Sequence, residues 1–188
     1  GIDIPGLQVP QVRIDDLAAA MDGTNHLLRL GHRKIALIMG SGYSVGDKRL
    51  AGYKRALEEA GVSFDDSLLQ AGGYTLESGY DAMNALLSRH GDLDAVFALS
   101  DEMAAGAMHA AFQQGIDIPH DISLLGFDGI TLAAYTNPKL TTVSQPICEI
   151  GEKAAQLLLK MLESNEVVPK LTIMAHTIQQ GDSCLDRR

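Results

Sequence analysis

The chain has no tryptophan, only two cysteines, and no apolar run that approaches the length of a membrane span. Crossing a bilayer takes about 20 predominantly apolar residues in one helix, so we expect no contact with a membrane. Two thiols, Cys148 and Cys184, are too few for a disulfide framework. Their scarcity is typical of a protein from a reducing compartment, and we expect a cytoplasmic location.

Basic residues, metal-ligand clusters and a leader segment are also scarce or absent. The 24 acidic residues outnumber the 15 basic ones and give a net charge of −9, which predicts repulsion from a phosphate backbone. The six histidines are scattered, so neither a metal nor a cofactor is expected. The segment 1–5 has no basic start, no apolar stretch and no initiator methionine. We therefore expect no signal peptide, and we expect a piece of a longer protein.

The residues that are present alternate between short apolar runs and amphipathic helical patterns. Such alternation is typical of an α/β fold with a parallel, doubly wound sheet. A length of 188 residues allows one complete α/β subdomain and a fragment of a second. The polar tail 181–188 is expected to fray. Predicted strands cover 12–14, 35–39, 67–71, 95–99, 122–127, 141–144 and 171–177, and predicted helices cover 18–30, 47–60, 76–89, 101–114 and 149–162.

Two acidic residues directly follow predicted strands. Asp101 comes after strand 95–99, and Asp128 comes after strand 122–127. Ligands of open α/β sheets bind outside the carboxyl ends of the strands, and carboxylates accept hydrogen bonds from hydroxyl groups. The pattern therefore predicts a crevice for a hydroxyl-rich ligand. An N-cap of the following helix is the alternative interpretation for Ser100 and Asp101.

Two further side chains are expected at the same crevice. Arg49 begins the helix after the glycine-rich loop 40–46, where a guanidinium can hold two neighbouring hydroxyls or a carboxylate. A solvated surface arginine is the alternative. Tyr74 follows the Gly72-Gly73 break, where its ring can cover the apolar face of a sugar. A core aromatic is the alternative there.

The glycine-rich loop also matches an enzyme motif. Residues 42–46 (GYSVG) have the G-x-S-x-G pattern of a hydrolase nucleophile elbow, and Asp128 and His176 follow Ser44 in the order of a catalytic triad. Three fixed positions in a glycine-rich loop arise readily by chance. No HGGG-type oxyanion segment is present, and His176 lies within predicted strand 171–177. We therefore expect no enzyme, and a Ser44 hydrolase remains an alternative.

Segments along most of the chain resemble the effector-binding core of the lactose/galactose/purine repressor family, whose fold matches that of periplasmic sugar-binding proteins. Each segment alone is weak, but together they occur in the family's order, which makes the resemblance specific. They are IDD at 14–16, HLLRLGHRKIA at 26–36, RLAGY at 49–53, Tyr74 with ESGY at 77–80, SDEMAAGAM at 100–108, DISLLGFD at 121–128 and PKLTTVSQP at 138–146.

The resemblance implies a role for each matching residue. Arg49 and Asp128 match the main ligand-gripping arginine and aspartate of the family, and Tyr74 matches the aromatic that lies over the ligand. Ser100 and Asp101 match an Asn-Asp pair at the same site. The remaining implied ligand-binding residues are Asp15 at the crossover between subdomains, Tyr43 in the loop, Phe127 before the aspartate, and Gln145 where the chain crosses back.

The resemblance also implies the ligand-sensing and dimerising region of a bacterial transcriptional repressor. A small effector closes two lobes of such a protein and changes its affinity for operator DNA. We favour a neutral sugar, because Asp47 adds negative charge at the lip of the crevice. The expected partners are a second copy of the chain and, only through a segment outside this chain, operator DNA. A periplasmic sugar-binding protein of an uptake system is the alternative.

The chain departs from the family pattern at several positions. Asp16 and Ser100 stand where the family usually has asparagine, and Val45 stands where a polar residue often reaches the ligand. The pocket is therefore expected to be less polar than a typical pyranose site. The helix-turn-helix head and most of the N-terminal subdomain have no match in the chain.

The resemblance divides the chain into three parts. Residues 1–14 and 146–171 match part of the N-terminal subdomain. Residues 15–145 and 172–180 match the C-terminal, effector-binding subdomain, and residues 181–188 form a tail.

Overall fold

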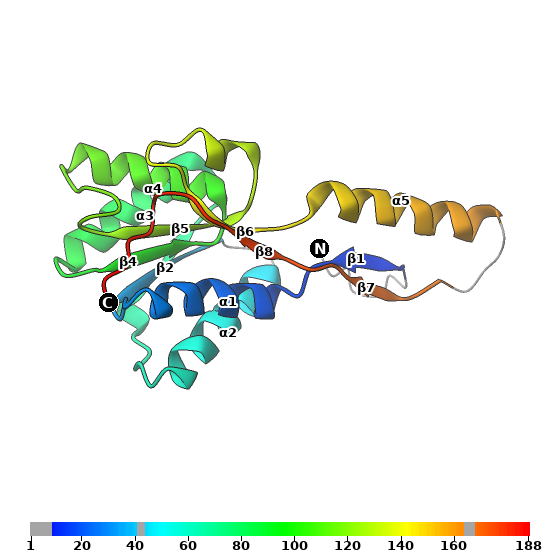
Figure 1. Cartoon of the computed structure of the whole chain (residues 1–188), viewed down its shortest axis with the longest axis horizontal. Coiled ribbons are helices and arrows are strands. Elements are labelled where there is room, and N and C mark those ends of the chain that lie inside the picture. Colours follow the sequence, from blue (N-terminus) through cyan, green and yellow to red (C-terminus); the bar gives the residue numbers. More distant parts are fainter. Residues whose placement is uncertain (1–8, 41–43, 164–167) are drawn as a thin grey trace.

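A six-stranded sheet forms the centre of a body from which a smaller arm projects (Figure 1). The computed structural model describes residues 9–40, 44–163 and 168–188. The strand order of the large sheet is β3-β2-β4-β5-β6-β8, and all neighbours are parallel except β8, which is antiparallel to β6. The strands are β2 (Ile35–Gly40), β3 (Leu69–Gly72), β4 (Ala95–Ala98), β5 (Ser123–Asp128), β6 (Thr141–Ser144) and β8 (Thr177–Gln179).

Helices cover both faces of this sheet (Figure 1). On one face α1 (Asp16–Arg29) packs against α2 (Ser44–Glu59), and on the other α3 (Leu76–Arg89) packs against α4 (Asp101–Gln113). Two 3-10 turns, η1 (Asp66–Leu68) and η2 (Thr131–Ala134), precede β3 and follow β5. Every residue of β4 is buried, as expected for a parallel strand covered on both faces. The predicted doubly wound α/β sheet is confirmed.

The arm consists of a small two-stranded sheet and one long helix. Strand β1 (Gln11–Arg13) pairs in parallel with β7 (Leu171–Ile173), and α5 (Ile147–Glu163) packs against β1. Leu157 is buried, whereas Leu158, Leu159 and Leu162 are more than half exposed. The arm therefore presents an apolar helix face without cover from the described residues.

The chain crosses between arm and body three times, from β1 to α1, from β6 to α5 and from β7 to β8 (Figure 1). Since α5 directly follows β6, the arm lies at the edge where the parallel strands have their carboxyl ends. The expectation of one strand over 171–177 is wrong, because residues 174–176 form the third crossing and separate β7 from β8, which belong to different sheets. The subdomain boundaries stay a prediction.

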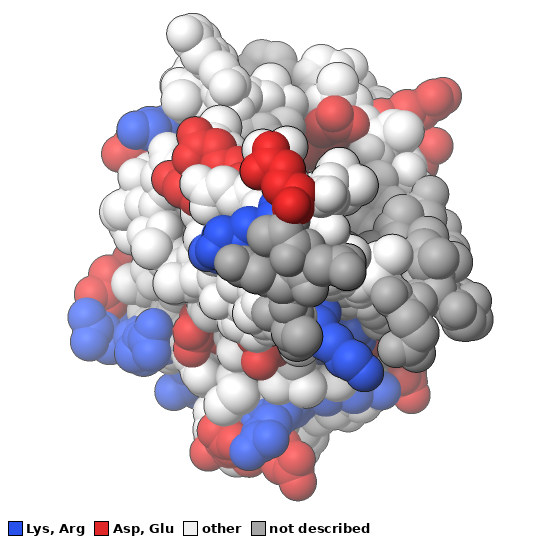
Figure 2. Space-filling view, turned by 90° about the vertical axis from the view of Figure 1, so that its right-hand side faces the viewer, with Lys and Arg blue, Asp and Glu red and all other residues white. Residues whose placement is uncertain are grey.

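The face at the arm end carries both signs of charge. Figure 2 shows separate groups of basic and acidic side chains among the described residues there, rather than one continuous basic surface. Both Cys148 and Cys184 are free thiols. Among the described residues, no helix combines the length and the apolar character that a membrane crossing requires.

The prediction that the tail 181–188 frays is wrong. Ser183 is fully buried; its hydroxyl donates to the Leu124 carbonyl and accepts from the Thr141 backbone N–H over 2.8 Å. The backbone carbonyl of Ser183 accepts from the Leu124 N–H over 2.7 Å, and the Leu185 N–H donates to the Ser123 hydroxyl over 2.9 Å. Ser183 and Leu185 thus take the place of strand partners where β5 and β6 begin, whereas residues 186–188 are exposed.

Ser183→Ala should lower the free energy of unfolding by about 1–3 kcal/mol, because it leaves the buried Thr141 N–H and Leu124 carbonyl with one partner fewer. Urea denaturation measures the change. Ser88→Ala removes an exposed hydroxyl that bonds within α3 and should cost at most about 0.5 kcal/mol. Equally small changes in the free energy of unfolding for the two substitutions would show that Ser183 does not stabilise the sheet.

Candidate functional site

Arg49 and Asp128 meet at the carboxyl edge of the large sheet, although they are far apart in the sequence. Arg49 comes from α2, which follows β2, and Asp128 is the last residue of β5. Because β2 and β5 belong to one parallel set, both residues are delivered to the same edge. Arg49 Nη2 lies 3.8 Å from Asp128 Oδ1. The two residues that the sequence predicts as the main ligand contacts thus lie together.

Arg49 is buried, and contacts with Asp16, Leu99 and Phe127 fix its guanidinium. Its Nε donates to Asp16 Oδ1 over 3.0 Å and its Nη1 donates to the Leu99 carbonyl over 2.9 Å. The guanidinium carbon lies 3.6 Å from the centroid of the Phe127 ring, a cation–π contact. Arg49 is only 5% exposed, so the alternative of a solvated surface arginine is wrong. It also lies in the second turn of α2 rather than at its start, because the helix begins at Ser44.

Asp16 is a residue of this cluster that the sequence analysis did not assign to the site. It is 2% exposed and is the first residue of α1. Its neighbour Asp15, which was predicted as a ligand contact, is exposed and caps α1 by accepting from the Leu17 and Ala18 N–H groups over 3.1 Å each. The Asp15-Asp16 pair in the sequence could have indicated this residue, because the first acid caps the helix and the second is buried.

Asp128 is strained and oriented by Gln145. Its φ of 112° is unusual for a residue other than glycine, and such conformations concentrate at functional sites. Gln145 donates from Nε2 to Asp128 Oδ1 over 2.7 Å and from its backbone N–H to the Asp128 carbonyl over 3.0 Å. Burial raises the pKa of Asp128, and the Arg49 charge opposes that rise. None of the described residues donates a hydrogen bond to Asp128 Oδ2.

Tyr74 is strained as well and lies against the end of β2. Its φ is 60°, and it and Asp128 are the two non-glycine residues with positive φ in the described part of the chain. Its ring packs directly on Gly40, where an added Cβ would lie 1.8 Å from Tyr74 Cζ. A side chain at Gly40 is therefore incompatible with this ring position.

Ser100 and Asp101 make contacts within the protein. The Ser100 hydroxyl accepts from the Met103 N–H over 3.1 Å and caps α4, as the alternative interpretation held. Asp101 is fully buried, and its carboxylate accepts from the Thr142 hydroxyl over 2.6 Å and from the Ile130 N–H over 2.8 Å. It therefore fixes the segment after Asp128 against α4 and β6. A direct contact of either residue with a ligand stays a prediction.

The other predicted contacts are distributed around this cluster. Phe127 is fully buried beneath Arg49, and Gln145 is half-buried beside Asp128. Tyr43 lies outside the described residues.

Asp128 and His176, the acid and the base expected for a Ser44 hydrolase, do not bond each other in the structure. His176 Nε2 bonds Asp22 Oδ2 over 2.9 Å, whereas Asp128 bonds Gln145. His176 also lies in the crossing between β7 and β8, not within a strand.

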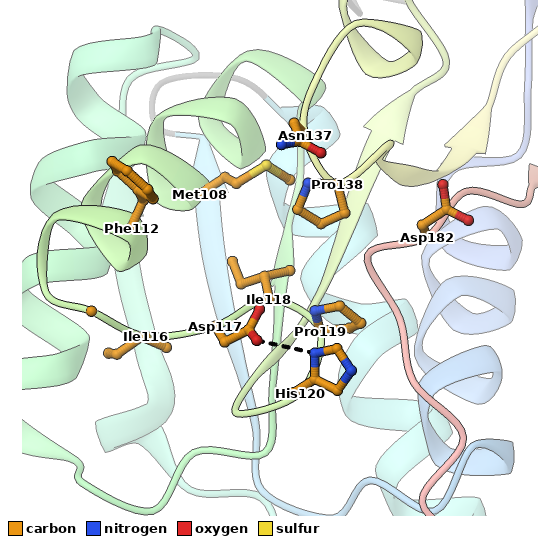
Figure 3. A pocket seen from close by; sticks show the side chains of 11 residues that line it. Met108, Phe112, Ile116, Asp117, Ile118, Pro119, His120, Asn137, Pro138 and Asp182 are labelled. Atoms are coloured by element: carbon orange, nitrogen blue, oxygen red, sulfur yellow. Dashed lines mark hydrogen bonds and ion pairs between the residues drawn. The ribbon is translucent and has the colours of Figure 1, made fainter.

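Two cavities lie at opposite edges of the sheet. One of about 630 Å³ lies where body and arm meet, and Gln145, Ser144, Ile147 and Thr177 are among its lining residues. Another of about 700 Å³ lies at the edge where β5 and β6 begin (Figure 3). Met108, Phe112, Ile118 and Pro138 line it, with a 3.1 Å contact between Asp117 and His120 at its rim. None of the predicted site residues lines the second cavity.

The cluster offers a donor and an acceptor side by side. Arg49 Nη2 can donate and Asp128 Oδ2 can accept, which suits the paired hydroxyl groups of a carbohydrate or a similar polyol. Within the described residues, no group of three or more histidine, cysteine or acidic side chains could hold a metal ion.

Comparison with known proteins gives consistent results. The model of the periplasmic binding protein-like domain matches residues 24–184. Among curated proteins, the HTH-type transcriptional repressor CytR of Escherichia coli is 41% identical over 164 residues, which are 87% of this chain and 48% of CytR. Catabolite control protein A of Priestia megaterium is 37% identical over 92% of this chain and 52% of its own length. The chain thus spans about half the length of these relatives.

Solved structures show the same similarity. A transcriptional regulator CelR–cellobiose complex has a TM-score of 0.89 and 35% identity over 96% of this chain and 55% of its own. A LacI family regulator from Enterococcus faecium with bound ribose has a TM-score of 0.91 and 31% identity over 99% of this chain and 69% of its own.

Asp101 should make stability fall as pH rises from about 4 to 6. Burial raises its pKa to about 6 in the folded protein, whereas an unfolded aspartate titrates near ~4. The folded state binds more protons at Asp101 in this interval. The contribution of Asp101 to the free energy of unfolding therefore decreases with rising pH and no longer changes once the pH is well above 6. The expected decrease is on the order of 3 kcal/mol.

Urea denaturation of the wild type and Asp101→Asn between pH 4 and 7 tests this expectation. The stability difference between the two proteins should be most favourable to the wild type at pH 4 and should shrink toward pH 6. Asp81→Asn replaces an exposed acid of α3 and serves as the control. Parallel pH curves for wild type and Asp101→Asn would contradict the assignment.

Proposed function

Because this chain belongs to the family of periplasmic binding protein-like domains carried by LacI-type transcriptional regulators, we propose that it senses a small effector for a transcriptional repressor. The family membership confirms the resemblance found in the sequence. The proteins similar to it are regulators, which favours regulation over catalysis and over sugar uptake.

One observation carries the proposal: Arg49 and Asp128 converge at the junction of body and arm, 3.8 Å apart. The two strained residues, Tyr74 and Asp128, both lie at this edge. Strain of this kind persists only where the surrounding structure enforces it, and it is concentrated at ligand sites. The cavity at the same junction is lined by Gln145 and by Gly129 and Ile130 directly after Asp128, and not by Arg49, Asp128 or Tyr74.

The ligand class we propose is a neutral sugar or another uncharged polyol. Hydroxyl groups can accept from Arg49 and donate to Asp128, and the Tyr74 ring can cover an apolar face. Two of the similar structures hold such molecules, cellobiose in one and ribose in the other. Arg49, Asp128 and Tyr74 are the proposed direct contacts, with Gln145 orienting Asp128.

The effector acts by closing the body and the arm on each other. Three chain crossings connect them, and a ligand held between them favours the closed arrangement by its additional contacts. That shift changes the affinity of the DNA-binding segment for its operator. The DNA contact belongs to residues outside this chain, in keeping with the net charge of −9.

A second copy of the chain is the proposed protein partner. Large apolar side chains are exposed on α3, on α4 and directly after η2, and α4 packs against both α3 and η2: Leu76 is 51%, Phe112 77% and Tyr135 82% exposed. Exposed aromatics of this size are typical of protein interfaces. A symmetric dimer through these elements would bring two DNA-binding segments together.

Asp128→Asn should abolish or strongly weaken the effector response while the protein still folds. Asparagine has the same shape and tolerates positive φ, but it loses a charged acceptor worth about 1.5–3 kcal/mol, or roughly 10- to 100-fold in affinity. A thermal-shift screen of the full-length protein against uncharged sugars, including ribose and cellobiose, identifies the ligand. Calorimetry then compares the variant with the wild type.

Glu58→Gln, an exposed change at the far end of α2, should leave the affinity unchanged. Equal affinity of Asp128→Asn and wild type would remove Asp128 from the site. No stabilisation by any sugar would contradict the sugar-sensing function.

Phe112→Arg should weaken dimerisation at least about tenfold, because a symmetric interface places two new charges near each other. Sedimentation velocity of the full-length protein measures the dimer. Leu159→Arg changes an exposed leucine of the arm and should leave the dimer intact. A monomeric wild type, or an unchanged dimer in Phe112→Arg, would rule out this interface.

A further inference from the structure

Two carboxylates flank one guanidinium in the candidate site. Asp16 Oδ1 lies 3.0 Å from Arg49 Nε and Asp128 Oδ1 lies 3.8 Å from Arg49 Nη2. Asp16 is 2% exposed and Arg49 is 5% exposed, so solvent screens their interaction little. The single positive charge of Arg49 is therefore balanced by Asp16 before any ligand arrives, and Asp128 leaves an excess of negative charge.

We infer that Asp16 determines the charge selectivity of the site, so that uncharged polyhydroxy ligands bind and phosphorylated or carboxylated ligands do not. The inference rests on the proposed function and specifies its ligand class. It assigns Asp16 a positioning and selecting role through Arg49, without contact between Asp16 and the ligand.

Hydrogen-bond geometry supports this assignment. A guanidinium binds a phosphate or carboxylate most firmly through two parallel N–H groups. Asp16 accepts from Nε and the Leu99 carbonyl accepts from Nη1. The pair formed by Nε and Nη2 is therefore closed to a ligand. The N–H groups of Nη2 and the second N–H of Nη1 remain for a ligand, and Nη2 lies 3.8 Å from the Asp128 carboxylate.

Electrostatics acts in the same direction. An anion at Nη2 would also lie beside Asp128, and like charges at such distances repel strongly where the dielectric is low. The negative charges of Asp16 and Glu102 already act on Asp128, and the buried Asp101 carboxyl lies close enough to feel Asp128. Acidic groups from α1, α4 and β5 thus lie around Arg49.

Asp16→Asn removes the charge of the Asp16 side chain and keeps its shape. The asparagine carbonyl can still accept from Arg49 Nε, so the guanidinium keeps its position while the cluster loses its excess negative charge. Inorganic phosphate is the probe, with binding to the full-length protein measured by calorimetry and by the side-chain Nε–H resonance of Arg49. We expect the phosphate affinity of Asp16→Asn to be at least about tenfold higher than that of the wild type, whose binding should be too weak to saturate.

Three further variants make the result specific. Glu58→Gln makes the same change of net charge at the far end of α2 and should gain nothing. Asp16→Asn combined with Arg49→Gln should lose the gain, because the anion then has no cation to bind. Asp128→Asn removes the other acid of the cluster and should also raise phosphate affinity, which keeps the test decisive if Asp16→Asn fails to fold.

Equal phosphate affinity in the wild type and in both acid variants would overturn the inference, as would an equal gain in Glu58→Gln. The sugar screen judges the proposed function separately. A sugar response in the wild type without a phosphate gain in the variants would defeat only the charge selectivity. A phosphate gain without any sugar response would defeat only the sugar-sensing function.

Discussion

The buried ion pair between Arg49 and Asp16 is the interaction on which the rest of the site depends. Neither group reaches solvent appreciably, and an unpaired charge in such a place costs several kcal/mol. The Leu99 carbonyl and the Phe127 ring complete the enclosure of the guanidinium. Helices α1 and α2 and strands β4 and β5 are thus tied together at the edge where the sheet faces the arm.

Strain at the same edge has a related origin. Asp128 and Tyr74 adopt positive φ values that ordinary residues avoid at a cost of about 1–3 kcal/mol each. Gln145 holds Asp128 from its main chain and its side chain, and the glycine at position 40 leaves room for the Tyr74 ring. The fixed arginine and the enforced turns together keep Arg49 Nη2 and Asp128 Oδ1 3.8 Å apart at the carboxyl edge of the sheet.

Regular elements were largely predictable from the sequence, because apolar periodicity reports how a segment meets a sheet. The helix over 76–89 and the strand over 141–144 have the predicted bounds, and the strand-end rule brings Arg49 and Asp128 to one edge. Long-range polar contacts were not predictable in this way. The buried Asp16, the tail anchored by Ser183 and the break at 174–176 depend on tertiary partners, and a local pattern carries no information about which partner a polar side chain finds.

Gln145 links Asp128 to the arm. Gln145 follows β6 directly and precedes α5 by two positions, so it belongs to one of the three crossings. Its two hydrogen bonds make Asp128 and this crossing a single unit. Asp101 holds the adjacent segment to β6 through Ile130 and Thr142. Under the proposed function, a ligand that contacts Asp128 would therefore also act on the start of α5 and so on the position of the arm.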